Sequence, residues 1–364
     1  MDLSIVYSSS QTVKPNRGIL KAVSARCRLL KQDILKPADM EGYKYSGPKD
    51  LEKEISSDHL KGKTAIVTGG ANGIGEAYTR GLVAAGLNVC IGDMDVEGGS
   101  KLASELQKYH STKFVKCDVS SWEDQVQLFR EAASFTGKVD YVIANAGVCP
   151  KDEVFDFSGP TLEPTKPSLT TIDINLKGTL YTTKLALHYF IKQNGQEPSP
   201  AQQDTCLVLI GSGAAFLDCP RGPQYQSTKW GVRGIMHSLR RTAFYYGSRV
   251  NVISPWYIPT KILSPSAFQH VQSRGVQLAT PASASACLIR ILSDRTMNGR
   301  SLFVSPEKWA PERGYLDLGL DSWFTEDDEE DDEGENGRKS KKELLKEIQR
   351  DQIIGAPVEE GLFV

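Results

Sequence analysis

The chain has 364 residues, of which 40% are hydrophobic and 24% are charged, as in an ordinary globular protein. This composition excludes a wholly disordered chain and a collagen-like one. The formal net charge is −2, so no global field attracts nucleic acid or a membrane surface, and we expect neither as a partner.

The cysteines indicate a reducing compartment. Seven of them are scattered along the chain without CxxC spacing, so we expect neither a disulfide framework nor a metal site. No apolar run approaches the ~18 residues of a membrane-spanning helix. The first ten residues lack a secretory pattern. Residues 14–31 are basic, as in a mitochondrial presequence, but Asp2 and Pro15 disfavour one, and we expect a cytoplasmic protein.

Composition divides the chain into three regions. Residues 1–60 contain three prolines and no sustained hydrophobic period, which predicts a mostly irregular N-terminal extension. Residues 61–320 are predicted to form the one folded domain. Residues 321–364 include eight consecutive acidic residues at 326–333, which predicts a disordered tail, since like charges repel. A short helix fits residues 339–354 of this tail.

The central region alternates short apolar runs with longer amphipathic ones. The runs at 64–68, 88–93, 113–118, 140–145, 206–212, 250–254 and 301–304 are rich in Val and Ile, as in strands buried on both faces. Helix-length segments lie between them, at 76–85, 122–135, 179–191, 225–245 and 282–292. This alternation predicts an α/β fold with a doubly wound parallel sheet of the Rossmann type.

The first predicted strand leads directly into a glycine-rich turn, TGGANGIG, at residues 68–75. Such a turn between a strand and a helix lets backbone amides approach a pyrophosphate at the positive end of the helix. We expect Gly69 to allow the tight turn, Gly73 the close approach, and Gly75 the packing of helix on strand. The site of a dinucleotide is therefore predicted here.

Five motifs, in order along residues 61–304, resemble the short-chain dehydrogenase/reductase family, and most closely its hydroxyprostaglandin-dehydrogenase-like members. They are TGxxxGxG in the glycine turn, NAG at 145–147, an asparagine in DINLKG, a serine followed by Tyr-x-x-x-Lys, and a proline and threonine after the sixth strand. The resemblance implies a homodimer or homotetramer. It assigns catalysis to Asn175, Ser212, Tyr225 and Lys229, and cofactor binding to Gly69, Asn72, Gly73, Ile74, Gly75, Asp93, Asp118, Val119, Asn145, Ala146, Gly147, Tyr225, Lys229, Pro255, Ile258 and Thr260.

The catalytic residue types fit alcohol oxidation. Tyr225 and Lys229 are four apart, so they share one face of a helix. A phenol has a pKa of ~10, and a neighbouring ammonium and an oxidised nicotinamide both favour the phenolate. We therefore expect the pKa of Tyr225 to fall, so that it accepts an alcohol proton. Ser212 would hydrogen-bond the substrate oxygen. The resemblance implies that Asn175 positions a water that connects Lys229 to solvent.

The cofactor prediction rests on Asp93, which ends the second predicted strand at about the 20-residue offset of a ribose-binding acid. Its carboxylate would bind the ribose hydroxyls and repel a 2′-phosphate. Neither Asn72 nor Met94 supplies a positive charge, so we expect NAD rather than NADP. Asp118 and Val119 match positions that flank adenine in the family, and Asp118 is also compatible with a helix N-cap.

Two positions depart from the family pattern. Ala144 stands where many members have asparagine, and Trp256 stands where the family usually has glycine. Trp256 either disturbs the approach to nicotinamide or lines a substrate cleft, together with Phe216, Leu217, Tyr257 and Ile258. Such a lining would suit a bulky hydrophobic substrate. Packing in the core is the alternative for each of these side chains.

These observations predict an NAD-dependent oxidoreductase that transfers a hydride between nicotinamide and a bulky, hydrophobic secondary alcohol or ketone. Residues 61–320 would then be the NAD-binding catalytic domain. The alternative is a catalytically inactive dinucleotide-binding scaffold that acts through its acidic tail. The intact Ser212, Tyr225, Lys229 and Asn175 disfavour that alternative.

Overall fold

A computed structural model describes residues 47–322 and residues 344, 347, 348 and 351. Eight strands form one sheet in the order β3-β2-β1-β4-β5-β6-β7-β8. Their bounds are β1 Thr64–Thr68, β2 Asn88–Asp93, β3 Thr112–Lys116, β4 Tyr141–Ala144, β5 Thr205–Ile210, β6 Ser248–Pro255, β7 Ser301–Val304 and β8 Tyr315–Asp317. β1 to β7 pair in parallel, and β8 runs antiparallel to β7.

The strand order determines where a ligand can bind. From β1 the chain proceeds outward to β2 and β3, and then returns to place β4 on the other side of β1. This reversal separates the loops that follow β1 and β4. A crevice outside the carboxyl ends of parallel strands is the usual ligand site in such sheets.

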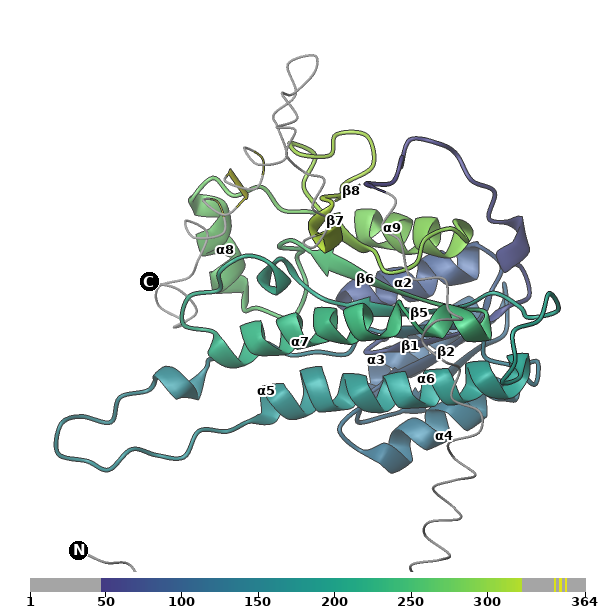
Figure 1. Ribbon diagram of the computed structural model, residues 1–364. Coiled ribbons are helices and arrows are strands. Elements are labelled where there is room, and N and C mark those ends of the chain that lie inside the picture. Colours follow the sequence, from purple (N-terminus) through teal and green to yellow (C-terminus); the bar gives the residue numbers. More distant parts are fainter. Residues whose placement is uncertain (1–46, 323–343, 345–346, 349–350, 352–364) are drawn as a thin grey trace, which may run out of the picture. The chain divides into compact units, whose positions relative to one another are not determined.

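Helices cover both faces of the sheet. One layer contains α2 (Gly73–Ala84), α3 (Val96–Leu106) and α9 (Pro281–Ser293), and the other contains α4 (Trp122–Ala133), α6 (Thr179–Asn194) and α7 (Pro223–Leu239). Figure 1 shows α4, α6 and α7 together on one side. The short helices are η2 (Asp58–Leu60), η3 (Glu153–Phe155), α5 (Thr170–Ile172), η5 (Gly213–Ala215), η6 (Ala243–Tyr246), α8 (Pro265–Ser273) and η7 (Leu320–Ser322), and residues Asp173–Gly178 form the π-helical turn η4.

Each helical layer buries its own hydrophobic core against the sheet. Tyr78 of α2 and Leu288 of α9 belong to one core, and Phe129 of α4 and Phe190 of α6 belong to the other. All five residues of β1 are buried, because both faces of that strand are covered. Burial on both faces explains why the strands are continuous apolar runs.

The predicted doubly wound parallel sheet is confirmed, with all seven predicted strands in place. β8 was not predicted, because three residues at a sheet edge give almost no periodic signal. α3 and α8 were not among the helix-length segments named as examples from the sequence. α7 ends at Leu239, so the predicted helix 225–245 continues only as the separate turn η6.

The predicted domain limits need correction at both ends. Leu51 and Leu60 are buried in the core, and Arg290 donates to the carbonyl oxygens of Asp50 (2.8 Å) and Leu51 (3.3 Å). Residues 47–60 therefore pack against the folded unit, although apart from η2 they form no helix or strand. Residues 1–46 lie outside the described part of the chain.

The described residues beyond 320 also contact the folded unit, although the sequence predicts a disordered tail from residue 321. Asp321 is buried and lies 3.1 Å from a guanidinium nitrogen of Arg233 on α7. Ile348 is fully buried in the first core, and Asp351 pairs with Lys308. Leu344 and Ile348 both belong to helical structure, as the sequence suggested. The acidic run 326–333 lies outside the described residues.

Within the described residues, no helix is both long and apolar enough to cross a membrane. The same part of the chain contains no group of three or more His, Cys, Asp or Glu side chains arranged to hold a metal ion.

Candidate active site

The glycine turn packs so closely that side chains cannot replace three of its glycines. Gly69 and Gly73 have positive φ angles of 62° and 57°. A Cβ on Gly69 would lie 2.7 Å from the Cα of Ala146, and one on Gly75 would lie 1.9 Å from the carbonyl oxygen of Gly69. The turn is therefore a cradle of bare backbone at the start of α2, as the anion-binding prediction requires.

Asn145 holds this turn in place from the end of β4. Its Nδ2 donates to the carbonyl oxygens of Thr68 (3.0 Å) and Gly69 (2.8 Å). The Thr68 hydroxyl accepts from the backbone amides of Asn145 (3.0 Å) and Ala146 (3.2 Å). Thr68 was not among the predicted site residues. Its place before the first glycine was the only signal, and its role is to connect the two loops.

A cleft adjoins the turn and gathers most of the predicted cofactor residues. We call it the glycine cleft. It is lined by Gly69, Asn72, Gly73, Ile74, Gly75, Asp93, Asp118, Val119, Asn145, Ala146, Gly147 and Thr260, all predicted from the sequence. Backbone glycines, acceptors at the strand ends and apolar walls together fit a dinucleotide.

The side chain of Asp93 is held in place at the carboxyl end of β2. Its two carboxylate oxygens each accept from a backbone amide at 2.9 Å, one from Ala71 in the glycine turn and the other from Asp95. Lys261 also lines the cleft, and its Nζ lies 3.8 Å from a carboxylate oxygen of Asp95. The sequence did not indicate this cation, because Lys261 is distant from Asp95 along the chain and approaches it only in the fold.

Asp118 does not cap the following helix. Its Oδ1 accepts from the amide (2.8 Å) and the hydroxyl (2.7 Å) of Ser120, which closes a local turn. Ser121 is the N-cap of α4, and it accepts from the Asp124 amide. The alternative role suggested for Asp118 is therefore wrong, since Ser121 occupies the capping position.

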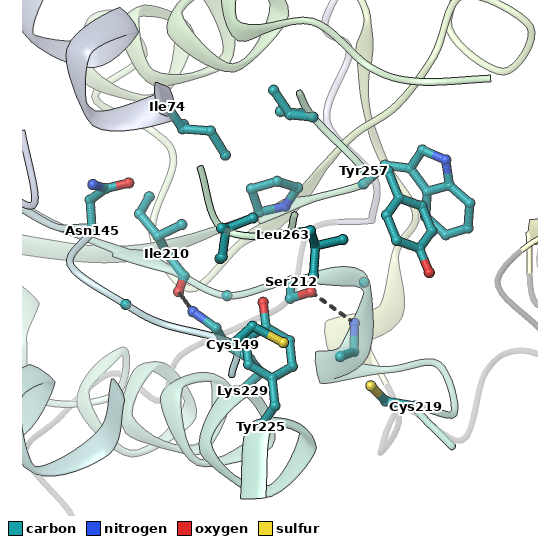
Figure 2. Close-up of a pocket in the computed structure, with 18 of the residues that line it drawn as sticks. Ile74, Asn145, Cys149, Ile210, Ser212, Cys219, Tyr225, Lys229, Tyr257 and Leu263 are labelled. Carbon is teal, nitrogen blue, oxygen red and sulfur yellow. Dashed lines mark hydrogen bonds between the residues drawn. The ribbon is translucent and has the colours of Figure 1, made fainter. Parts of the chain in front are cut away.

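A second cavity lies beside the glycine cleft, and we call it the apolar pocket. Ser212, Tyr225 and Lys229 line it together with Pro255 and Ile258 (Figure 2). Ile74, Asn145, Gly147, Cys149 and Ile262 line both cavities, so a ligand in one can touch a ligand in the other. Pro255 and Ile258, predicted to bind cofactor, lie on the apolar-pocket side.

Ser212 and Tyr225 present their hydroxyls to each other. Ser212 follows β5 and caps η5, where its Oγ accepts from the Ala214 amide at 3.2 Å. Tyr225 lies in the first turn of α7, and the Ser212 hydroxyl is close enough to its phenol to lower the phenol's pKa. A substrate oxygen between them would meet two hydrogen-bonding groups.

Lys229 is buried below Tyr225. Its Nζ donates to the carbonyl oxygen of Ile210 at 3.0 Å and lies 5.5 Å from the centre of the Tyr225 ring. Burial lowers the pKa of Lys229 to about 8, because the ammonium has lost most of its water. The side chain is therefore poised to change charge near neutral pH.

The pKa of Tyr225 shifts in the opposite direction to the one we predicted from the sequence. Burial in the apolar pocket raises it, the neighbouring Cys149 adds to the rise, and the hydrogen bond from Ser212 only partly offsets it. Spacing correctly predicted that Lys229 would approach Tyr225. It could not reveal that Lys229 would itself be desolvated and turned toward Ile210.

Asn175 lines neither cavity. It lies in the π-helical turn η4, and its side-chain amide both accepts from and donates to the backbone of Val148 at 2.8 Å. A Cβ on Gly147 would lie 3.2 Å from Asn175 Oδ1 and 3.6 Å from Lys229 Nζ. Asn175 therefore fixes the loop that separates the cofactor side from the lysine.

Trp256 both lines the apolar pocket and packs in the core. It is 5% exposed, and its indole nitrogen donates to the carbonyl oxygen of Gln277 at 3.0 Å. Tyr257 and Ile258 also line the pocket, whereas Phe216 and Leu217 pack in the core. The cleft interpretation thus holds for three of the five side chains. Cys149 and Cys219 complete the pocket wall around Tyr225. Their spacing in the sequence gave no sign that they would lie there.

Comparison with known proteins agrees with this geometry. The model of the short chain dehydrogenase family matches residues 63–269. The 5′-hydroxyaverantin dehydrogenase of Dothistroma septosporum is 32% identical, over 71% of this chain and 89% of that protein. The rat 15-hydroxyprostaglandin dehydrogenase [NAD(+)] is 28% identical, over 69% of this chain and 93% of that protein.

A relative named for NADP and a structure solved with NADH also match. The NADP-dependent dehydrogenase M3 of a Phoma species is 33% identical, over 72% of this chain and 80% of that protein. The 3-ketoacyl-(acyl-carrier-protein) reductase of Brucella melitensis, solved with NADH, has the same fold, with a TM-score of 0.56 and 23% identity over 67% of this chain and 97% of that one. The chain belongs to the short-chain dehydrogenase family and is an oxidoreductase that binds a nicotinamide dinucleotide.

Proposed function

We propose that the protein transfers a hydride between NAD and a bulky, hydrophobic secondary alcohol or its ketone. The observation that carries this proposal is the meeting of Ser212 and Tyr225 in an apolar pocket that shares a wall with the glycine cleft. Bound NAD would supply the hydride acceptor. The glycine turn would hold its pyrophosphate, and Asp93 its ribose.

The chain's own residues handle the proton. In oxidation, the O–H proton of the alcohol passes to the Tyr225 oxygen. The hydride leaves the carbon that bears this hydroxyl and goes to NAD, and a ketone results. Ser212 hydrogen-bonds the reacting oxygen and orients it. Lys229 lies close enough to favour the phenolate when it is charged, and its pKa of about 8 makes that charge dependent on pH.

The preference for NAD rests on Asp93. Its carboxylate stands where it would repel the 2′-phosphate of NADP, and its two amide contacts hold it there. The NAD-dependent rat relative supports this choice. Lys261 favours NADP, and so does the Phoma relative, which is named as NADP-dependent. Since Lys261 pairs with Asp95, we assign the larger effect to Asp93.

The substrate class follows from the walls of the apolar pocket. Trp256, Ile262, Leu263 and Phe268 supply apolar surface, and Ser212 and Tyr225 the reacting pair. Two relatives are named as dehydrogenases of hydroxylated compounds, 5′-hydroxyaverantin and 15-hydroxyprostaglandin, which supports an alcohol as the substrate. The rival function, an inactive scaffold, is disfavoured because Ser212, Tyr225 and Lys229 all line the same pocket. We also propose a cytoplasmic location, which the free cysteines of the described residues support.

Replacing Tyr225 by phenylalanine tests the function. Tyr225→Phe should abolish NAD reduction with hydrophobic secondary alcohols, because the proton acceptor is gone. It should leave the affinity for NAD, measured by calorimetry, nearly unchanged, because the glycine cleft is intact. Tyr109→Phe, at a residue that is 63% exposed, is the control. A Tyr225→Phe enzyme that kept more than about a tenth of the wild-type rate would rule out the proposed base.

A further inference from the structure

No group in the described part of the chain hydrogen-bonds the hydroxyl of Tyr257. Tyr257 follows β6 and lines the apolar pocket, and its oxygen is buried without a partner among the described residues. Leaving a polar group buried and unpaired costs free energy, so nearly all such groups in native proteins are satisfied. Bulk water does not reach this one, so only a molecule that enters the pocket can satisfy it.

The ring of Tyr257 is held in this orientation by an aromatic stack. It packs edge-to-face on Trp256 with 5.0 Å between ring centres, and Trp256 packs in the same way on Trp309 at 5.3 Å. The hydrogen bond from Trp256 to Gln277 fixes the middle of the stack, and the Ala279 amide donates to the Tyr257 carbonyl at 2.9 Å. The phenol is therefore prepositioned rather than free to turn to solvent.

The surroundings of the Tyr257 hydroxyl are the reactive part of the pocket. The titratable groups close enough to influence it are Cys219 and Cys149, and Tyr257 in turn influences Tyr225. Figure 2 shows Tyr257 and Tyr225 on different sides of the pocket. Thiols bond weakly to hydroxyls. Burial raises the pKa of Tyr257, so the group stays protonated and able to donate.

We propose that the Tyr257 hydroxyl donates a hydrogen bond to a second oxygen of the substrate, one that is distinct from the reacting alcohol. Ser212 and Tyr225 already serve the reacting oxygen, and Tyr257 approaches from another wall. The substrate class is thus narrowed to hydrophobic secondary alcohols or ketones that carry a further hydroxyl or carbonyl group. This inference rests on the proposed function. A buried donor that a substrate must satisfy rejects analogues without the matching acceptor.

Matched pairs of alcohols test the inference. The plain probe is methyl naphthyl carbinol, and the oxygenated probes are its ring-hydroxylated isomers. Wild type should prefer the best-placed isomer by about tenfold in kcat/KM, the effect of one net hydrogen bond. Tyr257→Phe should bring that ratio close to one. Tyr78→Phe is the control. It removes another buried hydroxyl without a partner among the described residues, on α2 and outside the pocket, and should leave the ratio as in wild type.

Thermal stability separates recognition from structure. Because the Tyr257 hydroxyl makes no bond in the free protein, Tyr257→Phe should not lower Tm. Tyr141→Phe, which removes a hydroxyl bonded to Asp204 at 3.4 Å, should lower it. If wild type and Tyr257→Phe were both active and preferred the oxygenated probe equally, this inference would be overturned and the proposed function would stand. Wild type that oxidised no probe would overturn the proposed function and this inference with it.

Discussion

Lys229 shows how one residue's surroundings set its chemistry. The lysine is 5% exposed, and its nearest partner is a carbonyl oxygen rather than a carboxylate. Among the described residues no carboxylate pairs with this ammonium, and its one carbonyl partner does not compensate for the lost water, so burial brings the pKa of Lys229 down from 10.5 to about 8. A catalytic helix that buries such a group is less stable than it would be with an apolar residue there.

This cost predicts a pH dependence of stability. Below pH 8 Lys229 is charged in both the folded and the unfolded state, so the cost is fully present. Between pH 8 and pH 10.5 only the unfolded chain keeps the proton, so the folded state gains stability as pH rises. From about pH 7.5 to about pH 9.5 wild type should gain roughly 2 kcal/mol relative to Lys229→Met. Denaturant unfolding of both proteins at the two pH values measures it.

Lys229→Arg is the control for that experiment, since its charge stays fixed over the whole range. If the difference in unfolding free energy between wild type and Lys229→Met stayed constant with pH, the lowered pKa of Lys229 would be contradicted. A difference that moved in the opposite direction with pH would contradict it too.

Among the elements, those with a strong repeating signal were predictable. β1 and β5 are uniformly buried and apolar, and α7 carries Tyr225 and Lys229 at the spacing of one helical turn. β8 and the π-helical turn η4 were not predictable, because their geometry depends on what they contact. β8 exists because Phe303 of β7 faces Leu316 across the sheet edge.

The burial of Ile348, in the C-terminal helical segment, leads to a second prediction. Ile348 is fully buried against the first core, although it follows an acidic run. Ile348→Ala should cost about 2 kcal/mol or more of unfolding free energy, because it removes buried methyl groups. The control Val154→Ala, at a side chain that is 51% exposed, should change stability little. If Ile348→Ala melted at the same temperature as wild type, the burial of Ile348 in the core would be contradicted.

For the whole molecule, the alternation of apolar runs with helix-length segments was enough to predict the sheet, and the motifs named most residues of the glycine cleft. Gly69, Asp93 and Asn145 come from three strands, and the parallel topology alone brings their carboxyl ends together. What the sequence left open depends on contacts between distant segments. Lys261 enters the cleft, residues 47–60 and 348 join the core, and Trp256 is supported by Trp309.

The central claim is NAD-dependent oxidation of a hydrophobic secondary alcohol, with Asp93 selecting the cofactor. The most direct test is the absorbance of reduced nicotinamide formed by the full chain from NAD and from NADP, with methyl naphthyl carbinol and its hydroxylated isomers. Asp93→Asn is the matched variant, since it keeps an acceptor for the Ala71 amide and removes the charge.

We expect wild type to favour NAD in kcat/KM by about tenfold or more, and Asp93→Asn to shift the ratio toward NADP, because the repulsion of the 2′-phosphate is gone. A wild-type enzyme that preferred NADP, or a ratio that Asp93→Asn left unchanged, would contradict the account.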